Sequence, residues 1–365
     1  MSQVRRSPLH DRHVALGARF SEFGGWEMPL QYSGVVAEHN RVRGSVGVFD
    51  VSHLGKLWVR GPGAVDFLNR CLSNDLGRIH AGQAQYTLVC NVDGGVVDDL
   101  IAYRLGDDEV LLIPNAANAA TVHELLARSA PSGIELRDAH TAYAVVAVQG
   151  PMSDETLAAL GLPVGQDYMA FAPGAWGGTA LTVCRTGYTG ERGYELVVPA
   201  EASGALWDAV LAAGAEYDIL PAGLGARDTL RTEMGYPLHG QDLSPSITAL
   251  ESGVGWAVGW GKPEFWGADA LKVEKSVGAA RVLRGLKATG RGIPRVRMEV
   301  VDQAGGRLGE ITSGTFSPTL GAGIGLALID SSVPLGARVG VLVRGRTEEF
   351  EVVRPPFVTP SVRQA

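Results

Sequence analysis

Cysteine is scarce in this sequence, which narrows the possible classes of function. The three cysteines, Cys71, Cys90 and Cys184, form no CxxC pair and are odd in number. A disulfide framework needs paired cysteines and a structural zinc site needs clustered ones, so the pattern argues against both. We expect a reducing, cytoplasmic compartment in which each thiol is buried in a core.

Long hydrophobic runs are also missing. No uninterrupted apolar segment approaches the roughly 18–20 residues that a membrane-spanning helix needs. Residues 1–6 include charged side chains, but no apolar stretch follows them, so we expect no secretory signal. We therefore predict no membrane partner.

The chain has no excess of positive charge and no familiar nucleotide or metal motif. Its formal net charge is -7, the opposite of a surface that binds nucleic acid. Its eight histidines show no HxxxH or HxH spacing, and neither a Walker loop nor a GxGxxG turn is present. We expect no nucleic-acid partner, no metal and no Rossmann site.

Glycine, by contrast, is abundant, with 49 glycines among 365 residues. Together with a hydrophobic content of 45%, this favours a folded α+β protein with many tight turns. The length exceeds one ordinary core, so two or three domains are expected. Helical and strand-like runs alternate in most of the chain; we expect a helix or loop over residues 9–22 and a short amphipathic helix over residues 35–43. From Arg281 onward, short β-like runs separated by glycine turns indicate a small terminal β-domain.

The most informative segment runs from Arg185 to Glu195 and contains three glycines before an apolar run. Glycine adopts backbone conformations that other residues avoid, so this pattern predicts a tight turn that leads into a strand. The segment presents Tyr188, Glu191 and Glu195. An aromatic face beside a carboxylate suits a flat heterocycle with adjacent N–H donors, because the carboxylate accepts two charge-assisted hydrogen bonds. A surface hairpin with solvated acids is the alternative.

Two adjacent acids, Asp98 and Asp99, follow a hairpin motif at residues 91–95 and precede a strand-like run at 100–103. Neighbours in a strand face opposite ways, so we expect only one of the two to point into a given pocket. A carboxylate beside apolar residues can have a raised pKa and serve in proton transfer. A solvated acid in a turn is the alternative.

Two arginines lie four residues apart on a helix predicted over residues 223–234. Arg227 and Arg231 therefore share a helix face, and two guanidinium groups on one face suit an anionic or carbonyl-rich ligand. Alternatively, each forms an ordinary surface salt bridge with Asp228 or Glu233.

Taken together, six segments in order resemble the aminomethyltransferases of the glycine cleavage system, the T-proteins. The matching segments are residues 23–29, 49–53, 91–99, 187–191, 226–231 and 311–318. The resemblance implies an α+β fold in which three domains form a cloverleaf around a central folate channel, with a small C-terminal β-barrel.

It also implies domain limits. Domain one, which would be split and bind folate, would comprise 1–50 plus 140–243. Domain two, which would be ferredoxin-like, would comprise 51–139 plus 244–278, and the barrel 279–365.

The same resemblance implies a reaction and a set of site residues. The one-carbon unit of an aminomethyl group, carried on the lipoyl arm of H-protein, would pass to tetrahydrofolate with release of ammonia. Asp99 matches the family's catalytic carboxylate, and Glu195 matches the acid that binds the pterin edge. The other matched folate contacts are Tyr86, Asn115, Tyr188, Arg227 and, near the end of the chain, Arg363. The sequence departs from the family at Leu54, where methionine is common, a swap that conserves volume.

Two further functions fit the same scaffold. One is a non-catalytic folate-binding protein, and the other is a folate-dependent demethylase of a small methylated compound. The joint presence of Asp99, Glu195 and Arg227 favours catalysis. The identity of the donor follows from the resemblance alone, and the sequence does not show where a cationic channel mouth for the acidic folate tail would lie.

Overall fold

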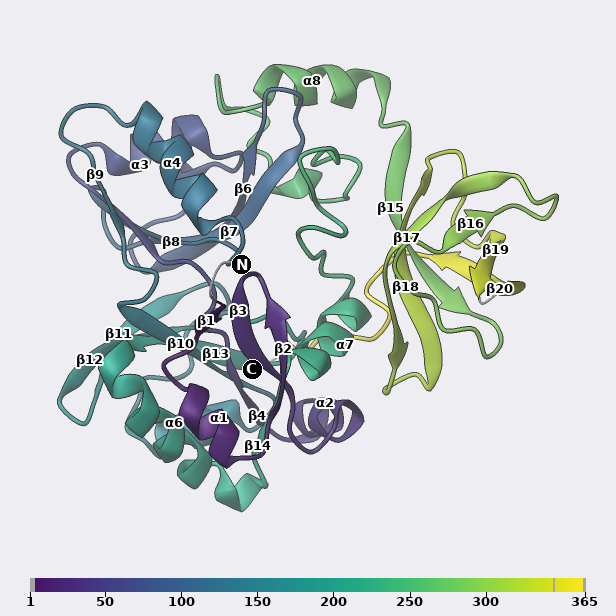
Figure 1. Ribbon diagram of the computed structural model, residues 1–365. Coiled ribbons are helices and arrows are strands. Elements are labelled where there is room, and N and C mark those ends of the chain that lie inside the picture. The colour runs from purple at the N-terminus through teal and green to yellow at the C-terminus, as the bar shows by residue number, and fades with distance from the viewer. Residues whose placement is uncertain (1–3, 344, 364–365) are drawn as a thin grey trace.

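The computed structural model describes residues 4–343 and 345–363 and shows three lobes around a common centre (Figure 1). Two lobes combine helices with a sheet, and the third is a closed six-stranded barrel at the C-terminal end. The α+β class and the terminal barrel confirm the predicted fold class. The limits given above for the three domains stay a prediction.

Lobe one is built on a six-stranded sheet in the order β11-β12-β13-β10-β4-β14. Its strands are β4 (Gly47–Asp50), β10 (Tyr143–Gln149), β11 (Phe171–Trp176), β12 (Thr179–Cys184), β13 (Gly193–Pro199) and β14 (Leu220–Pro221). A small sheet of β1 (Arg5–Arg6), β3 (Trp26–Gln31) and β2 (Arg19–Phe23) adjoins it. The stretch expected to be a helix or loop over residues 9–22 thus divides into α1 (His10–Ala15) and most of β2.

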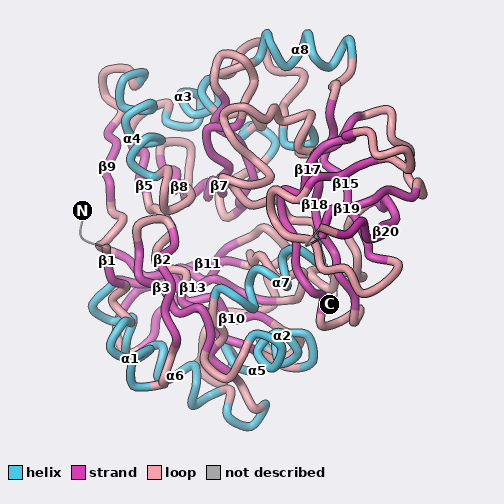
Figure 2. Tube along the Cα trace, turned by 45° about the vertical axis from the view of Figure 1, so that its right-hand side comes forward, coloured by secondary structure: helices cyan, strands magenta, loops and turns pink. Residues whose placement is uncertain are grey.

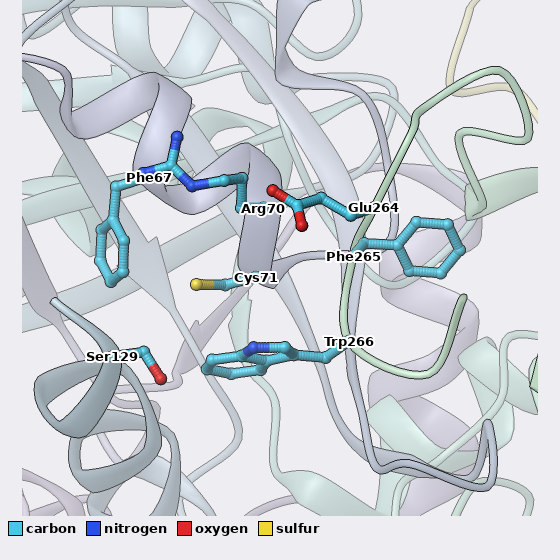
Figure 3. Close-up of a pocket in the computed structure, with 7 residues that line it drawn as sticks. All are labelled: Phe67, Arg70, Cys71, Ser129, Glu264, Phe265 and Trp266. Carbon is cyan, nitrogen blue, oxygen red and sulfur yellow. The ribbon is translucent and has the colours of Figure 1, made fainter. Parts of the chain in front are cut away.

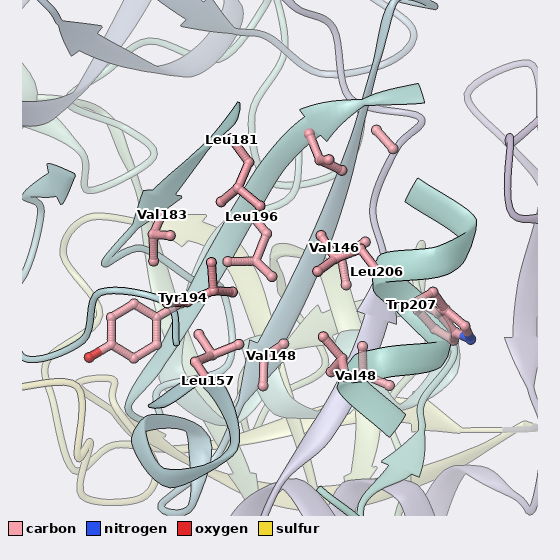
Figure 4. Packing of buried hydrophobic residues seen from close by; sticks show 14 of the residues in the cluster. Val48, Val146, Val148, Leu157, Leu181, Val183, Tyr194, Leu196, Leu206 and Trp207 are labelled. Carbon is pink, nitrogen blue, oxygen red and sulfur yellow. The ribbon is translucent and has the colours of Figure 1, made fainter. Parts of the chain in front are cut away.

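The central strand β10 shows why this sheet is covered on both faces. Side chains alternate along a strand, and here both alternating sets are apolar. Val146 and Val148 pack with α6 (Ala200–Ala213) and α5 (Ser153–Ala158) in the core shown in Figure 4. Val145 and Ala147 pack on the opposite face with α2 (Val35–Gly44) and α7 (Leu224–Met234). The helices over residues 35–43 and 223–234 that the sequence predicts are therefore confirmed.

Lobe two is a five-stranded sheet in the order β6-β7-β8-β5-β9, with helices α3 and α4 packed against it. The elements are β5 (Leu57–Arg60), α3 (Ala64–Cys71), β6 (Gln83–Cys90), β7 (Val96–Arg104), β8 (Glu109–Ile113), α4 (Ala119–Ser129) and β9 (Glu135–Asp138). The predicted hairpin at 91–95 joins β6 to β7, and the Asn91 carboxamide oxygen accepts hydrogen bonds from the backbone of Asp93 and Gly95. Helix α8 (Ala268–Val277) and the loops before it cover the β6–β7 end.

The third lobe is a closed barrel in the order β15-β18-β17-β16-β19-β20. Its strands are β15 (Arg281–Ala288), β16 (Glu299–Val301), β17 (Arg307–Ser317), β18 (Ala322–Asp330), β19 (Arg338–Val343) and β20 (Arg346–Val353). Figures 1 and 2 both place α7 between the strands of lobe one and the barrel. All three cysteines are free and buried, as the sequence predicts. Within the described residues, no helix is both long and apolar enough to cross a membrane.

A buried carboxylate on α7 joins lobe one to the barrel. Glu233 receives hydrogen bonds from Arg43 of α2 (Nη2–Oε2 2.8 Å), from the Thr319 hydroxyl (2.9 Å) and from Ser317 of the barrel. His39 Nε2 lies 3.3 Å from its other oxygen. Burial alone would raise the pKa of Glu233, but His39, Ser317 and Arg43 together lower that pKa to about 2.

Glu233→Gln should lower the free energy of unfolding at neutral pH by roughly 3 kcal/mol, because a lowered carboxyl pKa means that the ionised form stabilises the fold. That contribution is present above the ordinary pKa of 4.5 and is lost as the pH falls toward 2. The difference in free energy of unfolding between parent and variant, measured by urea denaturation, should therefore become smaller over this pH range. Glu22→Gln, at an exposed position on β2, is the matched control and should show no such narrowing. If the difference in free energy of unfolding between the parent and Glu233→Gln does not change with pH, the lowered pKa of Glu233 is contradicted.

Candidate functional site

The two adjacent acids lie on β7, opposite the irregular end of β6, where the strand register shifts between Val89 and Cys90. Asp98 is fully buried and Asp99 is half-buried. The Tyr86 hydroxyl donates to Asp99 Oδ2 (2.9 Å), and Asn115 Nδ2 donates to Asp99 Oδ1 (2.8 Å). Asp99 is therefore held by one hydrogen bond to each carboxylate oxygen.

The expectation that only one of the two acids points into a given pocket stays a prediction, and both carboxylates accept a hydrogen bond from Asn115. Its Nδ2 atom lies 2.9 Å from Asp98 Oδ1, and its backbone N–H also donates to Asp98 (3.1 Å). Asn115 follows the end of β8, beyond the regular pairing with β7, so its amide reaches both side chains. Asp98 also accepts from Asn118 (2.7 Å), and the alternative of a solvated acid is wrong for it.

Burial governs the electrostatics of this acid pair. It raises the pKa of Asp98, and the neighbouring Asp99 raises it further. Burial also raises the pKa of Asp99, although the hydrogen bond from Tyr86 and the charge of His239 oppose that shift. Asp99 can therefore hold a proton at a higher pH than a solvated aspartate does, which suits a group that transfers protons.

The turn predicted at 185–195 leads into β13, which begins at Gly193, so Glu195 lies in the strand itself. Thr186 donates its hydroxyl to Glu195 Oε2 (2.6 Å), and Tyr103 in turn donates to Thr186 (3.0 Å). These bonds fix one oxygen of Glu195. Glu191 is different, because it is 8% exposed and pairs with Arg43 (2.8 Å), so the alternative of a solvated acid is wrong for it as well.

Tyr188 brings the turn and α7 together. Its hydroxyl donates to the carbonyl of Pro237, and the Arg227 guanidinium carbon lies 4.6 Å from its ring centroid. Burial raises the pKa of Tyr188, and the charge of Asp99 contributes to that increase. The phenol, the acid on β7 and the arginine on α7 thus belong to one electrostatic environment, although they come from distant parts of the chain.

The two arginines predicted to share a helix face have different surroundings. Arg231 pairs with Asp228 (2.6 Å) and Asp242 (2.9 Å) and donates to Ser313 of the barrel (2.9 Å). Arg231 does form the salt bridge with Asp228 that the alternative named, but the alternative is wrong about a surface position, because the Arg231 side chain is only 2% exposed. Arg227 has a buried Nη1 atom with no hydrogen-bond partner in the part of the chain that the structure describes. Burial lowers its pKa, and the charge of nearby Glu195 opposes that shift.

Arg363 approaches the same region from the C-terminal tail. Its guanidinium carbon lies 5.5 Å from the ring centroid of Tyr168, and its charge opposes the burial-induced rise in the pKa of that phenol. Tyr236 adjoins this pair, because both Tyr168 and Arg363 act on its pKa. The ring of Tyr236 lies 5.7 Å from that of Tyr188. Aromatic rings thus connect Arg363 to the rest of the candidate site.

Two residues near the site were not predicted as site residues. His53 is 2% exposed, its Nδ1 atom has no partner, and burial and the charge of Arg227 lower its pKa to about 3. Trp256 is 67% exposed, with its ring stacked on Tyr86 at 5.2 Å. His53 belongs to the motif at 49–53, which could have drawn attention to it. Nothing in the local sequence distinguishes Trp256.

A surface hollow of about 300 Å³ lies elsewhere, between α3, α4 and the loop before α8 (Figure 3). It is lined by Phe67, Arg70, Cys71, Ser129, Glu264, Phe265 and Trp266. Burial raises the pKa of Cys71 to about 12, so this thiol is a poor nucleophile at neutral pH. The hollow shares no residue with the candidate site. Among the described residues, no cluster of three His, Cys, Asp or Glu side chains is placed to hold a metal.

Comparison with known proteins decides the family. Residues 9–262 match the GCVT N-terminal domain, and residues 281–359 match the glycine cleavage T-protein C-terminal barrel domain. The chain belongs to the glycine cleavage T-protein family. It is 60% identical to an aminomethyltransferase of Frankia alni over the full length of both chains. It is 56% identical to one of Mycobacterium tuberculosis, with 99% of each chain covered.

A solved structure supports the same assignment. The crystal structure of glycine cleavage system aminomethyltransferase T from Bartonella henselae superposes with a TM-score of 0.93 at 33% sequence identity. The match covers 98% of this chain and 99% of that one. The family resemblance inferred from the sequence is confirmed, and the chain is an aminomethyltransferase of the glycine cleavage system.

Tyr86→Phe should raise the pKa of Asp99 further, because a hydrogen bond that favours the ionised carboxylate is lost. The pKa can be followed through the carboxyl ¹³C chemical shift during an NMR pH titration. Tyr143→Phe is the matched control, since no side-chain hydrogen bond involves the Tyr143 hydroxyl among the described contacts of lobe one. An unchanged Asp99 titration in Tyr86→Phe would show that the hydroxyl does not stabilise the carboxylate.

Proposed function

We propose that this aminomethyltransferase passes the one-carbon unit of an aminomethyl group, carried on the lipoyl arm of H-protein, to tetrahydrofolate and releases ammonia. The observation that supports the proposal most directly is the half-buried carboxylate of Asp99, oriented by Tyr86 and Asn115 beside Tyr188. The family membership supplies the reaction class. The geometry supplies residues able to perform it.

The residues present fit a reduced pterin. Arg227 Nη1 is a buried donor without a partner, and such a donor is costly unless a ligand or water satisfies it. The donation from Thr186 to Glu195 involves Oε2, so Oε1 can accept a hydrogen bond from an N–H edge. Tyr188 and Tyr236 add aromatic faces. We therefore assign the pterin to Glu195, Arg227 and Tyr188, and the acidic folate tail to Arg363.

When bound, tetrahydrofolate supplies the nitrogen nucleophile that accepts the one-carbon unit. Asp99 serves this chemistry as the group that holds or takes up a proton, because burial raises its pKa. Tyr86 and Asn115 fix the direction of its two oxygens, so little reorganisation is needed when charge develops. Asp98 supports the arrangement by anchoring Asn115.

Asp99→Asn should lower turnover by roughly 10²-fold or more and leave tetrahydrofolate affinity nearly unchanged, because positioned acid–base groups contribute on this scale. Turnover is measured as ammonia release after mixing with aminomethyl-loaded H-protein and tetrahydrofolate, and affinity by calorimetry. Asp93→Asn, at the exposed tip of the same β6–β7 hairpin, is the matched control and should retain full turnover. Near-normal turnover in Asp99→Asn would remove Asp99 from the mechanism. An absence of ammonia release by the unmodified protein would refute the reaction itself.

A further inference from the structure

The C-terminal tail, residues 354–363, leaves the barrel after β20 and crosses back onto lobe one. The backbone N–H of Phe357 donates to the carbonyl of Glu233 (2.7 Å). Farther along, the N–H of Ser361 donates to the carbonyl of Gly190 (2.8 Å), and Arg185 donates to the carbonyl of Val362 (2.8 Å). The last part of the tail therefore lies on the turn at 185–195.

Glu191 is the acid of that turn which the proposed reaction does not use. One of its oxygens accepts from Arg43 Nη1 (2.8 Å), and the other accepts from the Ser361 hydroxyl. Its side chain is 9% exposed. Both carboxylate oxygens are occupied within the protein, so Glu191 is poorly placed to bind a ligand and well placed to hold the tail.

We propose that Ser361 and Glu191 form a latch that holds the tail on the turn and thereby positions Arg363 at the folate site. This inference rests on the proposed function, in which Arg363 binds the acidic part of tetrahydrofolate. Only one residue, Val362, separates Ser361 from Arg363, so fixing Ser361 leaves Arg363 little freedom to move away from Tyr168. Ser361 and Glu191 are positioning residues, because they act on the ligand through Arg363.

Conformational entropy explains why a latch matters. Ordering the backbone of a free tail costs conformational entropy, and a tail that is disordered before binding would subtract that cost from the affinity for the ligand. When Ser361 is bonded to Glu191, the tail is already ordered in the folded protein, so ligand binding does not have to order it. Glu191 is itself held by Arg43, which also pairs with Glu233, so the anchor of the latch belongs to the rigid junction between lobe one and the barrel.

The test is a double-mutant cycle on the full-length protein with Ser361→Ala, Arg363→Ala and the double variant. Ser361→Ala should raise KM for tetrahydrofolate about 3–10-fold with kcat within about twofold, as expected when binding alone is weakened. The double variant should be no worse than Arg363→Ala, because the latch acts through Arg363. Thr359→Ala, which removes an exposed hydroxyl from the same tail, is the matched control, and Ser361→Thr should restore the parent KM.

A second measurement, hydrogen exchange, tests whether Ser361 and Glu191 hold the tail and does not involve tetrahydrofolate. Hydrogen exchange of the tail peptide should accelerate about tenfold in Ser361→Ala and not in Thr359→Ala, because local opening becomes easier. Unchanged exchange would overturn the latch. If exchange accelerates but the effects of Ser361→Ala and Arg363→Ala on KM multiply in the double variant, the positioning of Arg363 is overturned. The same follows if Arg363→Ala alone does not change KM. Failure of the proposed reaction would appear separately, as absent turnover of the parent protein with normal tail protection.

Discussion

The buried ionic contacts of α7 are the constraint on which the rest of the structure depends. Arg231 and Glu233 are both nearly inaccessible to solvent. Besides their partners on α7 and α2, each also binds a group from outside these helices: Arg231 pairs with Asp242, and Glu233 accepts a hydrogen bond from Ser317 of the barrel. A buried charge without its partner costs several kcal/mol, so these contacts penalise any other seating of the barrel on lobe one. Their role is therefore to specify one arrangement of the lobes. That arrangement fixes α7, and with it Arg227.

The candidate site also uses α7, but its arginine on this helix, Arg227, is paired differently from Arg231. Arg227 lies one turn before Arg231 on the same face, yet among residues 4–343 and 345–363 no carboxylate pairs with it directly, and one of its nitrogens is buried without a partner. Asp99 is half-buried and is held by hydrogen bonds without a salt bridge among the described contacts. The protein thus pairs its buried charges at the interface between lobes, whereas within the described residues Arg227 has no carboxylate partner at the site. A buried donor without a partner leaves an interaction available for a ligand, and burial is what raises the pKa of Asp99.

Local patterns made much of the fold predictable, whereas long-range partners were not. The hairpin at 91–95 and the helices near 35–43 and 223–234 follow from residues close together in sequence, and all are present. The separate fates of Arg227 and Arg231 could not be read from a helix period, because Asp242 and Ser313 reach only the latter. Nor could the role of Glu191, since its partner Ser361 lies 170 residues away. The site residues came from the family resemblance, while propensity and periodicity located only the elements that carry them.

The glycines of the segment at 185–195 are required by close packing as well as by backbone conformation. A Cβ at Gly187 would lie 2.1 Å from the Gln149 side chain, and a Cβ at Gly190 would lie 2.0 Å from the sulfur of Met234. Gly190 also has a positive φ of 82°, which side chains disfavour. The glycines are therefore required by close packing against β10 and the end of α7. That packing, rather than direct contact with a ligand, is what lets one short turn direct Tyr188 and Glu195 toward the site and Glu191 toward the tail.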